Sequence, residues 1–324
     1  MILVTGATGF LGAELVFQLL KTEEKIRCLK RESSVIPKKL KAFANKIDWL
    51  VTDILDFADL EGAFEGVTQV YHCAALVSFD ESLKAKMLQV NAEGTANVVN
   101  LCIQFGVEKL VYVSSVAALG TAKADKLIDE NCFWEGFEIK DAYAVSKYRA
   151  EMEVWRGIEE GLNAVIVNPS VIIGADAGTS GSGAIFESVK NGLNYYTRGG
   201  TGFVDVEDVA KCMILLMRKP VKNERFIINA ENLSYQNLFK QVAKEFGARV
   251  PNKLAKTWML NLAWRFTSLK NMLFGKKGGI NKTLIKTAEK VSHYDNQKIK
   301  AQLDYQFIPL NQSITKVVNG LKSA

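Results

Sequence analysis

Residues 2–12 read ILVTGATGFLG, a short apolar run that leads directly into three regularly spaced glycines. The first four residues have the composition of a buried strand, and leucines at helical spacing follow the glycines. The glycines permit a tight turn, a close approach of the backbone to a pyrophosphate and close packing of helix on strand. Because the N-terminus of the following helix offers free N–H groups to an anion, the stretch predicts a dinucleotide site. The residues expected to contact the cofactor here are Gly6, Thr8, Gly9, Phe10, Leu11 and Gly12.

Strand-like apolar runs alternate with helical patterns over the first 170 residues. Strands that are separated by helices form βαβ crossovers, which give a parallel sheet covered on both faces. The sequence therefore predicts an α/β fold with a doubly wound parallel sheet, the Rossmann type of NAD(P)-binding architecture. The expected strands are 2–5, 25–30, 46–53, 67–75, 109–115 and 162–170, and the expected helices are 56–65, 81–104 and 141–160.

The pattern becomes less regular after residue 170, and helical segments dominate the last 90 residues or so. We expect residues 1–170 to form the dinucleotide-binding domain, with residues 203–220 returning to it. A smaller, mostly helical C-terminal lobe, residues 171–202 and 221–324, would close over the carboxyl edge of the sheet and bind the substrate. This lobe also contains one further strand-like run, ERFIINA (224–230).

The composition is that of an ordinary globular protein, with 48% hydrophobic and 23% charged residues among 324. The net charge of +6 is not gathered into a Lys/Arg block, so the sequence predicts no nucleic-acid binding. Five widely spaced cysteines without a C-x-x-C pair indicate a reducing, cytoplasmic compartment, and two distant histidines give no metal-ligand pattern. The chain shows no signal peptide and no run of 18 apolar residues, so no membrane span is expected.

The end of the second expected strand favours NADP(H) over NAD(H). An NAD site has an acidic residue at this position, which accepts hydrogen bonds from the ribose hydroxyls. Here the strand ends with Lys30 and Arg31, two cations that suit a 2′-phosphate, which an arginine can bind through two hydrogen bonds. Glu32 is the one nearby acid, and NAD(H) stays the alternative. Asp53 and Ile54, after the third strand, are expected to flank the adenine, although Asp53 could also cap the next helix.

DAYAVSKYRA (141–150) places Tyr143 and Lys147 four residues apart in an expected helix, so that the two side chains share one face. Taken alone, such a pair is most often an ordinary surface pair. Two further stretches, HCAA (72–75) and VSSVAALG (113–120), stand at the carboxyl ends of expected strands, where open α/β sheets bind ligands. The fold would therefore bring all three stretches to one edge of the sheet.

Several short motifs run in order along the first two-thirds of the chain, namely TGATGFLG (5–12), Asp53-Ile54, YHCAA (71–75), NAEGT (91–95), YVSS (112–115), YAVSK (143–147), VNPSVIIG (167–174) and FVDVEDVA (203–210). Together they resemble the extended short-chain dehydrogenase/reductase family, of the NAD-dependent epimerase/dehydratase type. ADAGTSGSGAIF (175–186) and GGTGFVDVEDVA (199–210) are also similar to a group described as dihydroflavonol-4-reductase-like and hopanoid-associated sugar epimerases. Several motifs in the family order are more specific than any one of them.

The resemblance implies roles for individual residues. Tyr143 would be the general acid/base on a substrate hydroxyl or carbonyl, and Lys147, with the cationic nicotinamide, would favour its phenolate and hold the ribose. Ser115 would hydrogen-bond the substrate oxygen, with Ser114 as the alternative. Asn91 would either complete a proton relay or only pack between helices. The further residues implied as cofactor contacts are Ala74, Ala75 and Pro169.

The departures from the family's patterns favour a reductase. Dehydratases carry Thr-Asp-Glu where residues 115–117 read Ser-Val-Ala, so the acid pair for water elimination is absent. Sugar-nucleotide enzymes usually place an arginine two residues before the F-V-x-V motif, where Thr201 stands, although Arg198 or Arg225 could substitute. We expect an NADP(H)-dependent oxidoreductase that interconverts a ketone and a secondary alcohol, similar to dihydroflavonol reductases and 3-hydroxysteroid dehydrogenases. The alternatives are a nucleotide-sugar epimerase with tightly bound NAD and a non-catalytic dinucleotide-sensing protein.

Residues 253–277 carry six Lys/Arg and no acid, with four aromatic residues among aliphatic ones. We expect helices of the small lobe here, lining the pocket of a hydrophobic small-molecule substrate. A basic amphipathic segment of this kind can also lie on an anionic membrane surface or contact a second subunit. The resemblance allows a homodimer through helices 81–104 and 141–160, but the first of these could be apolar because it packs on the sheet.

Overall fold

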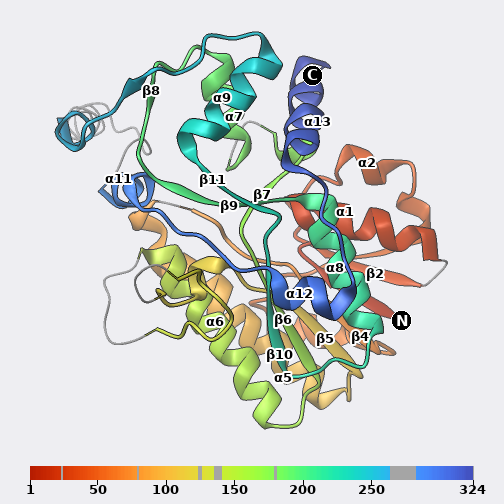
Figure 1. Ribbon diagram of the computed structural model, residues 1–324. Coiled ribbons are helices and arrows are strands. Elements are labelled where there is room, and N and C mark those ends of the chain that lie inside the picture. Colours follow the sequence, from red (N-terminus) through yellow and green to blue (C-terminus); the bar gives the residue numbers. More distant parts are fainter. Residues whose placement is uncertain are drawn as a thin grey trace.

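A sheet of seven parallel strands lies at the centre of the molecule (Figure 1). From one edge to the other the order is β3-β2-β1-β4-β5-β6-β10, so the chain begins in the middle and winds outward to each side in turn. The doubly wound parallel sheet expected from the sequence is confirmed. The strands are β1 (Ile2–Thr5), β2 (Ile26–Lys30), β3 (Ile47–Val51), β4 (Gln69–His72), β5 (Lys109–Val113), β6 (Ala164–Pro169) and β10 (Glu224–Ile228). The computed structural model describes residues 1–22, 25–78, 80–122, 126–134, 141–178, 181–262 and 282–323.

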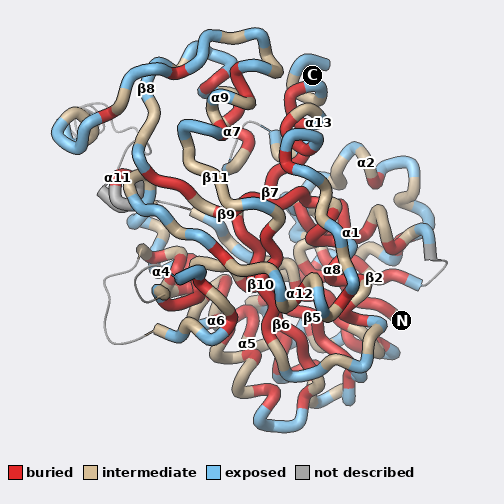
Figure 2. Tube along the Cα trace, viewed as in Figure 1, coloured by how far each residue is buried: buried red, intermediate tan, exposed pale blue. Residues whose placement is uncertain are grey.

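Helices cover both faces of this sheet, which explains why its strands are apolar without interruption. Successive residues of a strand point to opposite faces: Val4 packs in the hydrophobic core of the first face, and Leu3 packs in that of the second. The central strands are buried almost throughout (Figure 2). The first face is covered by α1 (Phe10–Leu19), α8 (Val206–Arg218) and α12 (Gln297–Leu303), the second by α3 (Phe57–Gly62), α5 (Gly94–Gln104) and α6 (Ala142–Glu159).

Several expected strands run past the observed ones at their carboxyl ends, and this difference positions the candidate site. The strand expected over 67–75 ends at His72, and the one expected over 109–115 ends at Val113. Residues 73–75 and 114–115 are therefore loop residues at the carboxyl edge of the sheet, where parallel α/β sheets bind ligands.

The helix expected over 81–104 is one continuous helical run with an irregular middle. A π-helical turn has a wider hydrogen-bond spacing than an α-helix and is often found at functional sites. Here it carries Asn91, which is buried. The run consists of η3 (Glu81–Leu83), α4 (Lys84–Leu88), the π-helical turn η4 (Gln89–Glu93) and α5.

Smaller sheets and further helices follow β6, in the upper part of Figure 1. A three-stranded sheet in the order β11-β9-β7 packs with three helices around a separate hydrophobic core, and β12 pairs with β8. These strands are β7 (Val171–Ile173), β8 (Tyr195–Tyr196), β9 (Gly200–Asp205), β11 (Glu231–Ser234) and β12 (Lys253–Leu254), and the helices are α7 (Gly183–Lys190), α9 (Tyr235–Phe246) and α13 (Leu310–Ser323). The remaining helical elements are α2 (Lys38–Lys41), α11 (Lys282–Glu289), η1 (Leu20–Thr22), η2 (Ala44–Lys46), η5 (Val116–Ala118) and η6 (Ala175–Ala177).

The strand β10 lies in the large sheet, beside β6. The prediction from the sequence assigns it, with the rest of residues 221–324, to the smaller lobe. Its residues Phe226, Ile227 and Ile228 are fully buried, and such a strand needs cover on both faces, which the large sheet provides. The helix α8 packs on α1 and the large sheet, where residues 203–220 are expected to return. Apart from the positions of β10 and α8, the division of the chain into two domains remains a prediction.

The basic segment 253–277 is described only as far as residue 262, and the predictions for residues 263–277 fall outside the described residues. Within the described part, Trp258 is 63% exposed and Leu262 is 45% exposed. None of the helices in the described ranges is both long enough and apolar enough to cross a membrane.

Candidate active site

The glycine loop joins β1 to α1 and lies directly against the end of β4. Gly6 has a φ of +68°, in the left-handed region that favours glycine, and its carbonyl accepts a hydrogen bond from the Gly9 N–H at 2.9 Å. A Cβ at Gly6 would collide with the backbone of Ala74, and one at Gly12 with the carbonyl oxygen of Gly6. The N-cap residue Gly9 has no side chain that could cap α1, so the loop fits a pyrophosphate at the free N–H groups. The other expected contacts of the loop are half-buried or buried: Thr8, Phe10 and Leu11.

Two of the three cations on and after β2 are available to a ligand. The Arg27 guanidinium is already used, since Nε donates to Asp48 Oδ2 at 2.7 Å and Nη1 to the Ala63 carbonyl at 2.9 Å. Lys30 is half-buried and Arg31 is exposed. Neither makes a side-chain hydrogen bond or ion pair with the part of the chain that the structure describes, so both are available to a 2′-phosphate.

Asp53 and Ile54 follow β3 and lie against the start of α5. The Ile54 side chain is buried against Gly94, and Asn97 Nδ2 donates to the Ile54 carbonyl at 2.9 Å. Asp53 does not cap the next helix: its Oδ1 accepts from the Leu55 N–H at 3.0 Å, and Asp56 is the N-cap residue of α3. The segment is therefore held in place with one Asp53 carboxylate oxygen still available.

Lys147 is buried on α6, with 2% of its surface exposed. Its Nζ donates to the Val113 carbonyl at 2.6 Å and to the Tyr112 hydroxyl at 2.9 Å. Burial lowers the pKa of Lys147 to about 7, while the nearby Glu151 and Cys73 act in the opposite direction. The lysine is thus an ammonium that burial brings close to its deprotonation point at neutral pH.

Tyr143 stands one turn before Lys147, at the start of α6, where Asp141 accepts a hydrogen bond from the Ala144 N–H at 2.7 Å and caps the helix. Ser115 lies near enough to the Tyr143 hydroxyl to affect the pKa of that phenol. Burial raises the pKa of Tyr143 above its usual value, Ser115 lowers it and Asp141 raises it. In the chain alone burial is therefore the largest influence, and the expected stabilisation of the phenolate needs the positive charge of a bound nicotinamide as well.

The two serines after β5 have different partners. Ser114 is buried, and its Oγ donates to Glu151 Oε2 at 2.5 Å. Ser115 is half-buried, and its Oγ accepts a hydrogen bond from the Ala117 N–H at 3.1 Å. It also lies near the Tyr143 hydroxyl and lowers the pKa of Tyr143. This arrangement favours Ser115 over Ser114 as the serine beside the reacting group.

Glu151 is the centre of a buried polar network that the sequence reasoning missed. It is 1% exposed and accepts hydrogen bonds from Ser114, from Asn168 Nδ2 at 2.9 Å and from Arg225 Nη1 at 2.9 Å. Asn168 also donates to the Ser115 carbonyl at 3.0 Å. The network therefore fixes the backbone that carries Ser115. An acidic residue four positions after Lys147, on the buried face of the helix, is the signal that could have identified it.

Arg225 is one of the two residues that could have replaced the family arginine expected at position 201. It cannot bind a substrate diphosphate. Its guanidinium is 5% exposed and, besides Glu151, it donates from Nε to the Glu130 carbonyl at 2.7 Å and from Nη2 to the Cys132 carbonyl at 3.4 Å. The other substitute, Arg198, is exposed. Arg225 instead ties the segment 126–134 to the sheet.

Asn91 packs between the strand ends and α6 through its side chain. Oδ1 accepts from the Leu76 N–H at 2.7 Å, and Nδ2 donates to the Leu76 carbonyl at 3.0 Å and to Ser146 Oγ at 2.8 Å. Its side chain thus holds the segment after β4, which includes the expected cofactor contacts Ala74 and Ala75. The third contact of that group, at the buried end of β6, is Pro169.

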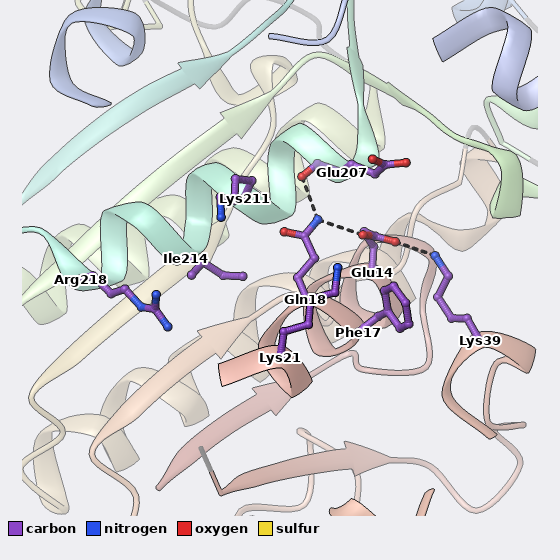
Figure 3. A pocket seen from close by; sticks show the side chains of 9 residues that line it. All are labelled: Glu14, Phe17, Gln18, Lys21, Lys39, Glu207, Lys211, Ile214 and Arg218. Atoms are coloured by element: carbon purple, nitrogen blue, oxygen red, sulfur yellow. Dashed lines mark hydrogen bonds and ion pairs between the residues drawn. The ribbon is translucent and has the colours of Figure 1, made fainter. Parts of the chain in front are cut away.

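A cavity of about 380 Å³ lies between α1 and α8, on the face of the sheet opposite to α6 (Figure 3). Lys39 spans one side of it, with Nζ at 2.6 Å from Glu14 Oε2 and at 2.6 Å from Asp176 Oδ2. None of the predicted site residues lines this cavity. It is therefore not the place where the residues predicted to be catalytic would meet a substrate.

The cysteines and histidines form no metal site in the described ranges. All five cysteines are free, and no group of three or more His, Cys, Asp or Glu residues there is arranged to hold a metal ion. His72 is fully buried, and its two ring nitrogens hydrogen-bond with Thr5 and Thr95. These contacts make it a structural residue rather than a metal ligand.

Comparisons with known proteins agree with this geometry. The pattern of the family described as NAD dependent epimerase/dehydratase matches residues 2–230. Among curated proteins, the chain is 30% identical to one from Synechocystis sp. that is named dihydroflavonol 4-reductase, over 99% of this chain and 94% of that one. It is 27% identical to cinnamoyl-CoA reductase 1 from Oryza sativa subsp. japonica, over 76% of each chain.

Solved structures give the same picture of the fold. A crystal structure titled gox2253 is 29% identical, has a TM-score of 0.85 and covers 100% of this chain and 98% of its own. The UDP-glucose 4-epimerase from Thermus thermophilus, solved with NAD, is 20% identical with a TM-score of 0.78 over 100% of this chain and 99% of its own. At that identity the likeness shows the fold alone.

Proposed function

The chain belongs to the NAD-dependent epimerase/dehydratase family, and on that premise we propose that it is an NADP(H)-dependent oxidoreductase that interconverts a ketone and a secondary alcohol. The observation that carries the proposal is the placement of Ser115 beside the Tyr143 hydroxyl, where it lowers the pKa of Tyr143, together with the buried ammonium of Lys147 one helical turn further on. These three groups stand at the carboxyl edge of the sheet, next to the glycine loop. A proton donor, an oxygen-binding hydroxyl and a cation are the groups that carbonyl reduction needs.

The glycine loop fits a dinucleotide, and Lys30 and Arg31 support NADP(H). Both side chains are unpaired within the described residues, while the third cation of the strand, Arg27, is used by Asp48 and a backbone carbonyl. Two available cations at the end of β2 suit a 2′-phosphate, whereas a ribose with free hydroxyls needs an acceptor there. NAD(H) would leave these two charges without a partner.

The protein's own groups handle the oxygen of the substrate. A bound NADPH would supply the hydride. The Tyr143 hydroxyl donates its proton to the carbonyl oxygen, and Ser115 donates a hydrogen bond to the same oxygen. Because burial raises the pKa of Tyr143, the phenol is protonated at neutral pH and ready to act as the acid in the direction of reduction. The ammonium of Lys147 then stabilises the phenolate that remains.

The substrate of this proposal is a small apolar ketone or the matching alcohol rather than a sugar nucleotide. Arg225 is buried in an ion pair, and Thr201 stands at the position of the family arginine that grips a diphosphate. Two curated relatives, over most of the chain, carry the names of reductases.

Titration with NADPH and NADH, followed by assays of ketone reduction with the purified protein, tests the proposal. We expect tighter binding of NADPH, and we expect Tyr143→Phe to abolish turnover while both cofactors still bind. Tighter binding of NADH together with conversion of UDP-sugars would favour the epimerase alternative. Cofactor binding with no turnover of any ketone, alcohol or sugar nucleotide would favour a dinucleotide-sensing protein.

A further inference from the structure

We propose that Tyr112, held by Thr95 and His72, is a positioning residue that keeps Lys147 a cation beside Tyr143. The inference rests on the catalytic role proposed above for Lys147, and it concerns residues to which that proposal assigns nothing. It starts from a continuous line of buried polar side chains between the glycine loop and α6. All members of the line are at most 2% exposed: Thr5, His72, Thr95, Tyr112 and Lys147.

Lys147 fixes the direction of the hydrogen bonds at its end of the line. An ammonium can only donate, so the Tyr112 hydroxyl oxygen accepts from Nζ at 2.9 Å. The Tyr112 O–H is then free to donate elsewhere. Burial raises the pKa of Tyr112, and Thr95 lies near enough to the Tyr112 hydroxyl to lower it. The Thr95 O–H is itself used, because it donates to the Asn91 carbonyl at 2.5 Å. The Thr95 oxygen is therefore an acceptor for Tyr112.

The same reasoning fixes the tautomer of His72. The Thr95 oxygen also accepts from His72 Nε2 at 2.9 Å, which places the ring proton on Nε2. Nδ1 is then the acceptor of the Thr5 hydroxyl at 2.6 Å, and Thr5 accepts from the Ala74 N–H at 3.2 Å. Burial and the Lys147 charge lower the pKa of His72 to about 3, so the ring stays neutral and this arrangement persists. Each hydrogen bond along this line of buried side chains therefore has a single direction from donor to acceptor.

Tyr112 meets the ammonium with its ring as well as with its hydroxyl. Lys147 Nζ lies 4.7 Å from the centroid of the Tyr112 ring, close enough for a cation–π interaction. The His72 ring also packs against Tyr112, with the two ring centroids 5.5 Å apart and an angle of 30° between the ring planes. The neighbouring strands β4 and β5 therefore hold Tyr112 in one place and in one rotamer.

The charge on Lys147 depends on a small set of neighbours. Glu151 on α6 and the Cys73 thiol after β4 raise its pKa, and burial lowers it to about 7. His72 is neutral, and Tyr143 is the other ionisable group on the same helix face. Tyr112 is the only side chain that the described residues place in hydrogen-bond contact with Nζ. Loss of its hydroxyl leaves the ammonium one partner short in a buried place, which favours the neutral amine.

The test is Tyr112→Phe, which keeps the ring and removes the hydroxyl. We expect the pKa of Lys147, followed by NMR of lysines labelled with ¹³C at Cε and assigned with Lys147→Met, to fall by about one unit. The pH at which ketone reduction declines should fall with it. The control is Tyr71→Phe, the same chemical change at a buried tyrosine on the opposite face of the sheet, which should leave both values unchanged.

Thr95→Val is the second variant, for the case in which Tyr112→Phe does not fold. It removes the acceptor of the Tyr112 O–H at nearly constant volume and should shift the titration of Lys147 in the same direction by a smaller amount. An unchanged titration of Lys147 in either folded variant would overturn the inference. Failure of the proposed function is a separate result, since it would appear as full turnover in Tyr143→Phe, whatever the titration of Lys147.

Discussion

Arg225→Met tests the buried network in which Glu151 is the central acceptor. The exposed fractions of the two side chains are 5% and 1%, and their atoms Nη1 and Oε1 lie 2.9 Å apart. Methionine fills much of the volume but leaves the Glu151 carboxylate without a cation, and removal of one partner of a buried pair typically costs about 3–5 kcal/mol. That is a large part of the roughly 5–15 kcal/mol by which domains are stable. For a chain of 324 residues it corresponds to a fall in Tm of roughly 4–7 °C.

The structure also offers a matched control and a double variant. Arg156 lies on the same helix, and the side chains of its ion pairs with Glu153 and Glu160 are 33–48% exposed, so Arg156→Met should cost less than about 1 kcal/mol. Combining Glu151→Gln with Arg225→Met removes the unpaired charge and should recover part of the loss, giving a coupling energy of about 1–3 kcal/mol.

Urea unfolding of five proteins measures these differences: the unchanged protein, Arg225→Met, Arg156→Met, Glu151→Gln and the double variant. Unfolding is followed by circular dichroism and by tryptophan fluorescence. Since Arg225 also donates to the carbonyls of Glu130 and Cys132, its variant loses these two contacts to the segment 126–134 as well. The reasoning is refuted if Arg225→Met destabilises the protein no more than Arg156→Met does. A double variant that is less stable than the two single changes predict would refute the assigned cause.

Arg31→Ala should weaken NADPH binding about 10-fold or more and leave the NADH affinity unchanged, because one charge-assisted contact to the 2′-phosphate is lost. Fluorescence titration with both cofactors measures the two affinities. Equal losses of affinity for NADPH and NADH would contradict the prediction. Asp208 accepts hydrogen bonds from the Tyr305 hydroxyl and the Ile308 N–H, and burial raises its pKa to about 6. An acid with a raised folded pKa binds protons more tightly when folded, so its contribution to stability is fully present below about pH 4 and is lost as pH rises through 6. The stability of the protein minus that of Asp208→Asn should therefore decrease over this range in urea titrations, and a flat difference would contradict the assignment.

The fold could be predicted from the sequence because its signals are local. A glycine loop between a buried strand and a helix, and apolar runs at regular intervals, specify parallel strands covered on both faces. The placement of β10 was less accessible. Its apolar residues indicate a strand, but only the pairing with β6, about 60 residues earlier in the chain, decides that it joins the large sheet.

The candidate site likewise has parts that the local sequence predicts and parts that depend on contacts between distant residues. Tyr143, Lys147 and the serine pair are visible as motifs, but nothing local distinguishes Ser114 from Ser115, because their partners Glu151 and Tyr143 lie on another element. The burial of Arg225 depends on an acid 74 positions away. The sequence pattern could not reveal it, since a lone arginine in a strand reads as a surface cation.

The π-helical turn at Gln89–Glu93 makes the number of residues in the helical run 81–104 decide where Asn91 points, as much as the residue types do. An α-helix advances by about 100° per residue, so a chain one residue shorter here could form a regular helix, yet it would rotate Asn91 away from Leu76 or Ser146. A single-residue gap at this place in an alignment would thus mark a relative whose β4 end is anchored differently. Evolution can change this edge of the candidate site by deletion, without exchanging any of the side chains predicted to contact a ligand.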